Sequence, residues 1–132
     1  MKDENVIIEK YGLCPSLTHH AEIRQLLEIE IKEHDDSEGC GEYLRVLCFM
    51  LFFIGKVEDS VLIWKAKMLN MDTGCMIDVG LLCGAGFEQT RTFIKDSPVL
   101  CKMKSYMEKC YAAGDEFDKG EIVRNFKAYY GC

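Results

Sequence analysis

The chain has 132 residues, of which 48% are hydrophobic and 29% charged, and its net charge is −6. This length suits a single domain over residues 1–132 with a core of its own, and the composition excludes a disordered protein. The longest apolar run, at 46–54, is too short for a bilayer, which needs roughly 20 residues. The charged start MKDENVIIEK is not a signal peptide. We therefore expect a soluble cytoplasmic protein.

Hydrophobic periodicity predicts helices along almost the whole chain. Over residues 21–33 the apolar side chains share one helical face, and Ser16 offers an N-cap. The alternation in LEIEIKE, at 27–33, leaves a strand as the alternative there. Residues 42–54 are apolar almost all round, which predicts a helix in the middle of the fold, and Gly55 is expected to end it.

The pattern continues through the second half of the chain. Residues 56–70 are expected to form an α-hairpin with the preceding helix and to share an apolar stripe of Val57, Val61, Trp64 and Met68. Asp72 is placed to cap a segment over 72–86. Further helices are expected over 87–96, from Ser97-Pro98 to Tyr111 and, after a break at 113–115, around Ile122 to Tyr130. The sequence predicts an all-α fold, a compact bundle or short α-solenoid-like stack of six to eight helices.

Residues 72–74 read Asp-Thr-Gly, the tripeptide that carries the catalytic aspartate of aspartic proteases. That reaction needs two carboxylates that share a proton, and here no second copy and no β-rich frame is predicted. The glycines that follow match neither phosphate-binding motif. We therefore predict no catalytic residues, no cofactor and no enzyme. The alternative is a small enzyme whose site is assembled from distant residues.

The eight cysteines include no C-x-x-C pair, so reduced thiols are expected rather than a disulfide framework or a metal site. Cys132, at the tail, is the expected reactive thiol. His19 and His20 are adjacent, and neighbouring side chains on a helix point about 100° apart. They are therefore poorly placed to hold one ion together.

Acidic residues are concentrated between positions 28 and 42, where seven acids and one base give a charge of −6, equal to that of the whole chain. Such a stretch repels nucleic acid and attracts a basic protein; the alternative is a solvated loop. The predicted partner-binding residues are Glu30, Glu33, Asp35, Asp36, Glu38 and Glu42.

Charged residues also interrupt the apolar central region: Glu58, Asp59, Lys65, Lys67, Asp72 and Asp78. Because a lone buried charge is costly, charges near a core are expected in pairs. We predict that one of the two lysines pairs with Glu58, Asp72 or Asp78. The cluster is then either a structural set of salt bridges or part of a binding surface.

Several short pieces resemble a group of small, all-helical bacterial proteins. The matching pieces are Val57-Glu58-Asp59-Ser60, Ile63-Trp64-Lys65-Ala66-Lys67, Asp72, Ile77-Asp78-Val79, Leu82-Cys83-Gly84-Ala85-Gly86 and Tyr129-Tyr130-Gly131. The group is similar in size, acidity and helical content to immunity proteins of contact-dependent inhibition and other polymorphic toxin systems. The resemblance implies a protein that binds and neutralises a cognate toxin, such as a nuclease, and it implies no catalytic residues.

Two interpretations of the partner stay open. In the first, the acidic stretch covers the basic cleft of a toxin. In the second, the protein is a helical-repeat adaptor or scaffold that binds an unrelated protein or peptide in a concave groove, with Trp64 as a candidate anchor. A homodimer through the aromatic C-terminus is a variant of the second. Neither interpretation involves nucleic acid or a membrane.

Overall fold

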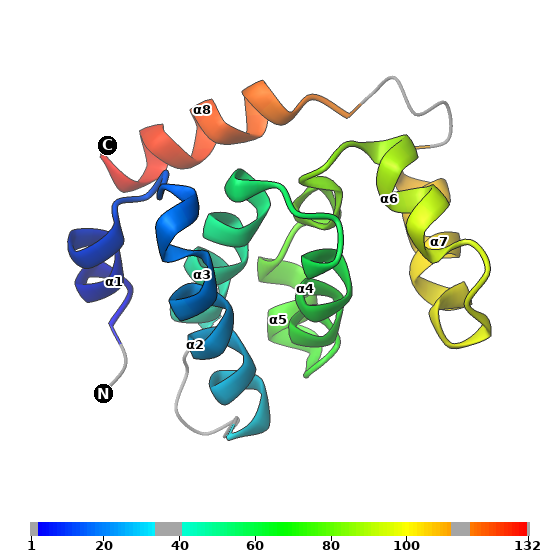
Figure 1. The fold of residues 1–132 in the computed structure, drawn as a ribbon, viewed down its shortest axis with the longest axis horizontal. Coiled ribbons are helices and arrows are strands. Elements are labelled where there is room, and N and C mark those ends of the chain that lie inside the picture. The colour runs from blue at the N-terminus through cyan, green and yellow to red at the C-terminus, as the bar shows by residue number, and fades with distance from the viewer. Residues whose placement is uncertain (1–2, 34–40, 112–116, 132) are drawn as a thin grey trace.

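The structure is a computed structural model that describes residues 3–33, 41–111 and 117–131. Within these ranges it contains eight α-helices, three 3-10 helices and no strand, which confirms the predicted all-α fold (Figure 1). The α-helices are α1 (Glu4–Tyr11), α2 (His20–Lys32), α3 (Gly41–Ile54), α4 (Asp59–Lys67), α5 (Met71–Met76), α6 (Phe87–Ile94), α7 (Cys101–Cys110) and α8 (Lys119–Tyr130). The 3-10 helices are η1 (Leu17–His19), η3 (Val79–Cys83) and η4 (Pro98–Leu100).

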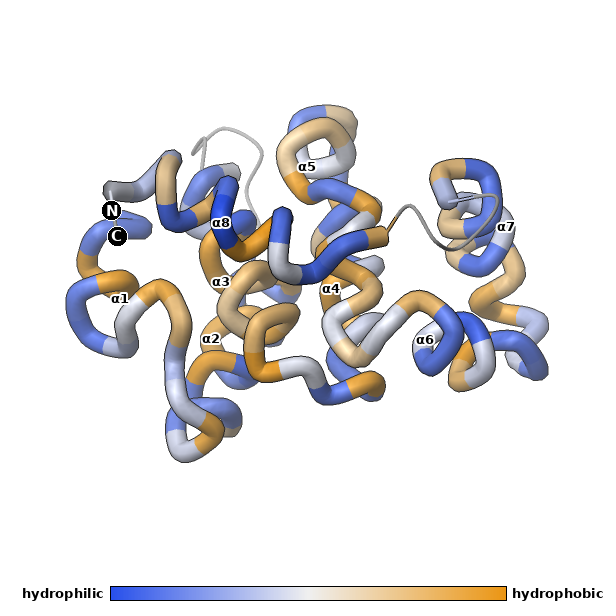
Figure 2. The backbone as a smooth tube through the Cα atoms, turned by 90° about the horizontal axis from the view of Figure 1, so that it is seen from above, coloured by the Kyte–Doolittle hydropathy of each residue, from blue (hydrophilic) through white to orange (hydrophobic). Residues whose placement is uncertain are grey.

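Helix α3 forms the centre of the hydrophobic core. From Tyr43 to Phe52 every residue except Arg45 is buried, because a helix that is apolar all round is stable only with neighbours on every side. Helices α1, α2, α4 and α5 and the short η3 all contact it. Figure 2 shows the hydrophobic colour running along α3 between these neighbours.

Two glycines allow the chain to turn and pack tightly around α3. Gly55 has a φ of 86°, and its N–H donates to the carbonyl of Leu51 at 3.0 Å, so it ends α3 as predicted. Gly84 follows η3 and lies against the end of α3, where an added Cβ would be 2.5 Å from the carbonyl oxygen of Phe52. The absence of a side chain at Gly84 therefore sets how closely η3 approaches α3.

Helix α8 lies across one end of the helices that surround α3 (Figure 1). The ring of Phe126 stacks on Phe49 of α3 with 4.2 Å between ring centroids. At the start of α8 the ammonium of Lys119 donates to the carbonyl oxygens of Phe53 at 3.1 Å and Gly84 at 2.8 Å. Burial lowers the pKa of Lys119. These contacts fix α8 to both α3 and η3.

The structure departs from the sequence-based expectations in three places. Helix α1 was not predicted; Asp3 caps it by accepting from the N–H of Asn5 at 2.9 Å. Residues 27–32 continue α2, so the strand alternative is wrong. The segment 72–86 is divided, because Ile77 is extended and separates α5 from η3. The predicted break at 113–115 lies outside the described residues.

In the parts of the chain that the structure describes, no helix combines the length and the apolar character that crossing a membrane requires.

Candidate functional site

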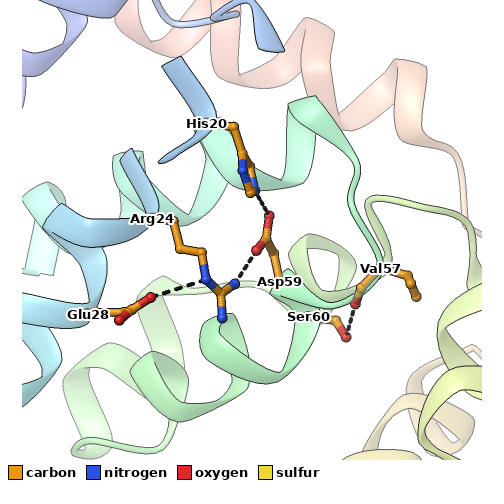
Figure 3. A network of polar contacts seen from close by, with 6 residues as sticks. All are labelled: His20, Arg24, Glu28, Val57, Asp59 and Ser60. Carbon is orange, nitrogen blue, oxygen red and sulfur yellow. Dashed lines mark hydrogen bonds and ion pairs between the residues drawn. The ribbon is translucent and has the colours of Figure 1, made fainter. Parts of the chain in front are cut away.

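A buried carboxylate joins α2 to α4. Asp59, the first residue of α4, is 1% exposed and accepts hydrogen bonds from the guanidinium of Arg24 and from Nε2 of His20, the latter at 2.6 Å. The Nε of Arg24 also lies 3.1 Å from the carboxylate of Glu28 on the next turn of α2 (Figure 3). Since Asp59 has cationic and polar partners on both oxygens, its burial is compensated. This network holds the first turns of α2 and α4 side by side.

A buried lysine joins α4 to the segment that follows it. Lys67 is 4% exposed, and its ammonium donates to the carbonyl oxygens of Gly74, at 2.5 Å, and Ile77. Burial lowers the pKa of Lys67, while the charge of Asp78 acts in the opposite direction. The ring of Tyr106 in α7 lies 5.2 Å from the same ammonium. Lys67 therefore holds α5 and the residue that follows it against α4 through hydrogen bonds to the backbone.

The predicted pairing of the central charges is wrong. Neither lysine forms an ion pair with a carboxylate in the described part of the chain, and Lys67 uses backbone carbonyls instead. Asp59 and Lys67 are the two members of the set that are buried; Asp59 contacts α2, and Lys67 contacts Gly74 and Ile77. The other members are exposed at the surface: Glu58, Lys65, Asp72 and Asp78.

The lowered pKa of Lys67 predicts a specific pH dependence. In the folded state Lys67 loses its proton below its ordinary pKa of 10.5, whereas in the unfolded chain it keeps the proton up to that value. Between the two, the unfolded state binds more protons, so the contribution of Lys67 to stability rises with pH. We expect the unfolding free energy of the wild type, relative to Lys67→Met, to increase as the pH is raised towards 10.5 in urea titrations. A flat difference over this range would contradict the assignment.

The Asp-Thr-Gly tripeptide forms the first turn of α5. Asn70 caps this helix: its side-chain oxygen accepts from the N–H of Thr73 at 2.8 Å, and the hydroxyl of Thr73 accepts from the N–H of Asn70 at 3.1 Å. The prediction that Asp72 is the cap is therefore wrong; Asp72 is exposed in the first turn, where a carboxylate suits the helix dipole. Thr73 is buried, and the reciprocal hydrogen bonds with Asn70 satisfy its polar groups.

The residues of the acidic stretch are dispersed over different environments. Glu28 is exposed on α2 and Glu33 is exposed directly after it, but Glu30 is 2% exposed and belongs to the buried side of that helix. Glu42, on α3, accepts a hydrogen bond from the hydroxyl of Tyr130 at 2.5 Å, so it holds the end of α8. The predicted residues Asp35, Asp36 and Glu38 lie outside the described residues.

The guanidinium of Arg45 contributes to the same attachment of α8. Its carbon lies 4.4 Å from the ring centroid of Phe126 and 5.1 Å from that of Tyr129. Burial raises the pKa of the Tyr130 hydroxyl, and its hydrogen bond to Glu42 raises this pKa further. The aromatic C-terminus is thus engaged within the fold.

An apolar groove opens between α2, α4 and η4. Its volume is about 400 Å³, and its lining is apolar except for Lys65. Trp64 lies in the groove, and its ring is 5.8 Å from that of Tyr106 in α7. Two lining side chains are strongly exposed, Met68 at 58% and Val99 at 86%. The residues that line the groove are Ile31, Val61, Trp64, Lys65, Met68, Leu69, Val99 and Leu100.

None of the described thiols is part of a disulfide, and they differ in burial, with Cys14 half-buried. Cys48 and Cys83 are buried as small hydrophobic side chains, and burial raises the pKa of Cys83 to about 12. The described thiols that are exposed belong to Cys75, Cys101 and Cys110. Cys132 lies outside the described residues. Within residues 3–33, 41–111 and 117–131, no three side chains of His, Cys, Asp or Glu are grouped so that they could hold a metal ion.

Sequence reasoning missed the two features that define this region. Asp59 is 39 positions from His20 and 35 from Arg24, and no local pattern connects residues so far apart. The sequence contained part of the pattern that forms the groove, because three residues of the predicted stripe, Val61, Trp64 and Met68, line it. A stripe alone does not show whether it faces a core or solvent.

Comparison with protein-family models, with curated proteins and with solved structures finds no match to this chain. The groove between α2, α4 and η4 is a candidate site in the described fold, and its apolar lining is suited to contact with another protein.

Proposed function

We propose that this is an immunity protein that binds a cognate toxin domain in the cytosol and neutralises it. The observation that carries the proposal is the apolar groove beside the acidic end of α2. Exposed Met68 and Val99 next to a half-buried Trp64 form the kind of apolar centre found in protein interfaces. The resemblance to immunity proteins supplies the class of partner.

Charge supports a basic partner. The stretch from 28 to 42 carries the chain's entire net charge of −6, and Glu33 is exposed where α2 ends. A nuclease toxin has a basic cleft for its substrate, so an acidic surface speeds its capture by electrostatic steering. Since Glu30 is buried and Glu42 holds Tyr130, we assign the steering role to Glu33 together with Asp35, Asp36 and Glu38.

The second candidate function is an adaptor that binds an unrelated protein. The groove with Trp64 suits this function as well, because an apolar groove does not by itself specify inhibition. The two candidates differ in what happens to the partner: a toxin loses its activity in the complex, whereas a protein held by an adaptor keeps its own.

Co-expression tests the proposal directly. The tagged protein is produced together with the product of the gene immediately upstream, and we expect a stoichiometric complex and protection of cells from that product's toxic domain. Absence of both complex and protection would overturn the immunity function. A complex without protection would favour the adaptor.

Two charge reversals test the steering. Glu33→Lys and Glu9→Lys change the net charge equally, and both positions are exposed, but Glu9 lies on α1. At low salt we expect Glu33→Lys to slow association with the toxin roughly tenfold more than Glu9→Lys does, and 0.5 M salt to remove the difference. Stopped-flow measurement of the association rate checks this. Equal effects of the two reversals would mean that the acidic stretch does not steer.

A further inference from the structure

The groove has a defined shape because its walls are fixed by internal contacts. Helix α2 supplies Ile31 on one side, α4 supplies Trp64 and Met68, and η4 closes the other side with Val99. The network around Asp59 holds α2 against α4 at their first turns (Figure 3). The lining residues Ile31 and Met68 lie at the other ends of these two helices. The groove is therefore present before any partner binds.

The lining excludes several kinds of occupant. Sites for small polar ligands place a few polar groups so that they converge on the ligand, whereas here Lys65 is the one charged residue in an otherwise apolar lining. A peptide that binds by adding a strand needs the edge of a sheet, and the described part of the fold has no strand. A helix satisfies its own backbone hydrogen bonds and needs only apolar contacts, so it is the element that fits.

Exposed side chains of opposite charge flank the groove on α2 and α4. Glu28 lies on α2 three residues before Ile31, which lines the groove, and it is paired with Arg24 (Figure 3). Lys65 is exposed on α4. A helix that lies in the groove is therefore complementary when its edge towards Glu28 is basic and its edge towards Lys65 is acidic.

We propose that the groove binds an amphipathic α-helix of the partner protein, with an apolar stripe against Trp64 and Met68, a basic edge facing Glu28 and an acidic edge facing Lys65. This inference rests on the proposed function and names the element of the toxin that is held. The acidic stretch accelerates the encounter, and the groove supplies the apolar contacts that slow dissociation.

The sequence has one tryptophan, Trp64, so its fluorescence reports occupation of the groove without a label. The probes are two designed helical peptides with the same Lys edge and Glu edge, one with a leucine stripe and one with serine in place of leucine. We expect the leucine peptide to shift the emission of Trp64 and the serine peptide to leave it unchanged. Equal responses to both peptides would overturn the proposal.

Matched variants locate the binding. Met68 lines the groove and is 58% exposed, while Met71 is 84% exposed and does not line it, so replacing either by aspartate leaves the core intact. We expect Met68→Asp to weaken binding of the leucine peptide at least tenfold and Met71→Asp to leave it within twofold. Lys65→Glu should weaken it as well. Equal loss in Met68→Asp and Met71→Asp would overturn the proposal.

The same variants, tested with the toxin, separate this inference from the proposed function. Loss of the toxin complex in Met68→Asp but not in Met71→Asp supports the inference. A toxin complex that forms equally with both variants keeps the immunity function and overturns the groove as its binding site. No toxin complex, together with binding of the leucine peptide, keeps the groove and overturns the immunity function. A wild-type dimer that Met68→Asp dissociates would show that a second copy occupies the groove, which would also overturn the inference.

Discussion

Replacing Asp59 by alanine is expected to lower the free energy of unfolding by about 3 kcal/mol. The substitution removes the acceptor shared by Arg24 and His20, whose side chains are 33% and 16% exposed, and leaves a partly buried guanidinium without its carboxylate. It also removes a negative charge from the first turn of α4. Urea unfolding followed by the emission of Trp64 measures the loss.

The control is Glu28→Ala. Glu28 binds the same guanidinium, but its side chain is 53% exposed, so water replaces most of the interaction. We expect this substitution to cost about 0.5 kcal/mol or less. If the two substitutions cost the same, Asp59 does not hold α2 against α4.

Gly84→Ala is expected to destabilise the fold by about 3 kcal/mol, at the upper end for an added methyl group in a packed region. The new Cβ would lie 2.5 Å from the carbonyl oxygen of Phe52 and 3.0 Å from its Cα. Both are backbone atoms, so no side-chain rotation relieves the clash, and η3 must move away from α3. Thermal and urea unfolding measure the effect.

Gly74→Ala is the matched control, because we expect this substitution to raise the free energy of unfolding, whereas Gly84→Ala lowers it. Gly74 lies inside α5, and its added Cβ would be 3.5 Å from the nearest atom, the carbonyl oxygen of Lys67, which is an ordinary contact. Alanine favours a helix over glycine by about 0.5–1 kcal/mol. If Gly74→Ala destabilises the protein as much as Gly84→Ala, the effect is not the close approach to Phe52.

The sequence alone was sufficient to predict those helices whose burial follows from their own apolar side chains. Residues 42–54 are apolar all round, so the helix and its central place follow from the pattern alone, and the structure confirms both. Gly55 ended this helix as expected, because a positive φ is needed there.

Helix α4 shows where such reasoning stops. Three residues of the predicted stripe, Val61, Trp64 and Met68, line the groove, while the buried residues of α4 include Asp59 and Lys67. These charges can be buried because each has polar partners. Arg24 and His20 bind Asp59, and the carbonyls of Gly74 and Ile77 accept hydrogen bonds from Lys67. A hydrophobic pattern ranks charged residues as solvent-facing and carries no information on partners supplied by other helices, so it does not reveal that Asp59 and Lys67 are buried.

The attachment of α8 has a consequence for how the protein is made. Arg45 and Tyr130, which bond at 3.2 Å, are 85 positions apart, and the ring of Phe126 stacks on that of Phe49. During synthesis the N-terminal helices leave the ribosome first. The part of α3 that α8 covers therefore stays open in the nascent chain until α8, Lys119–Tyr130, has been synthesised and can pack on it.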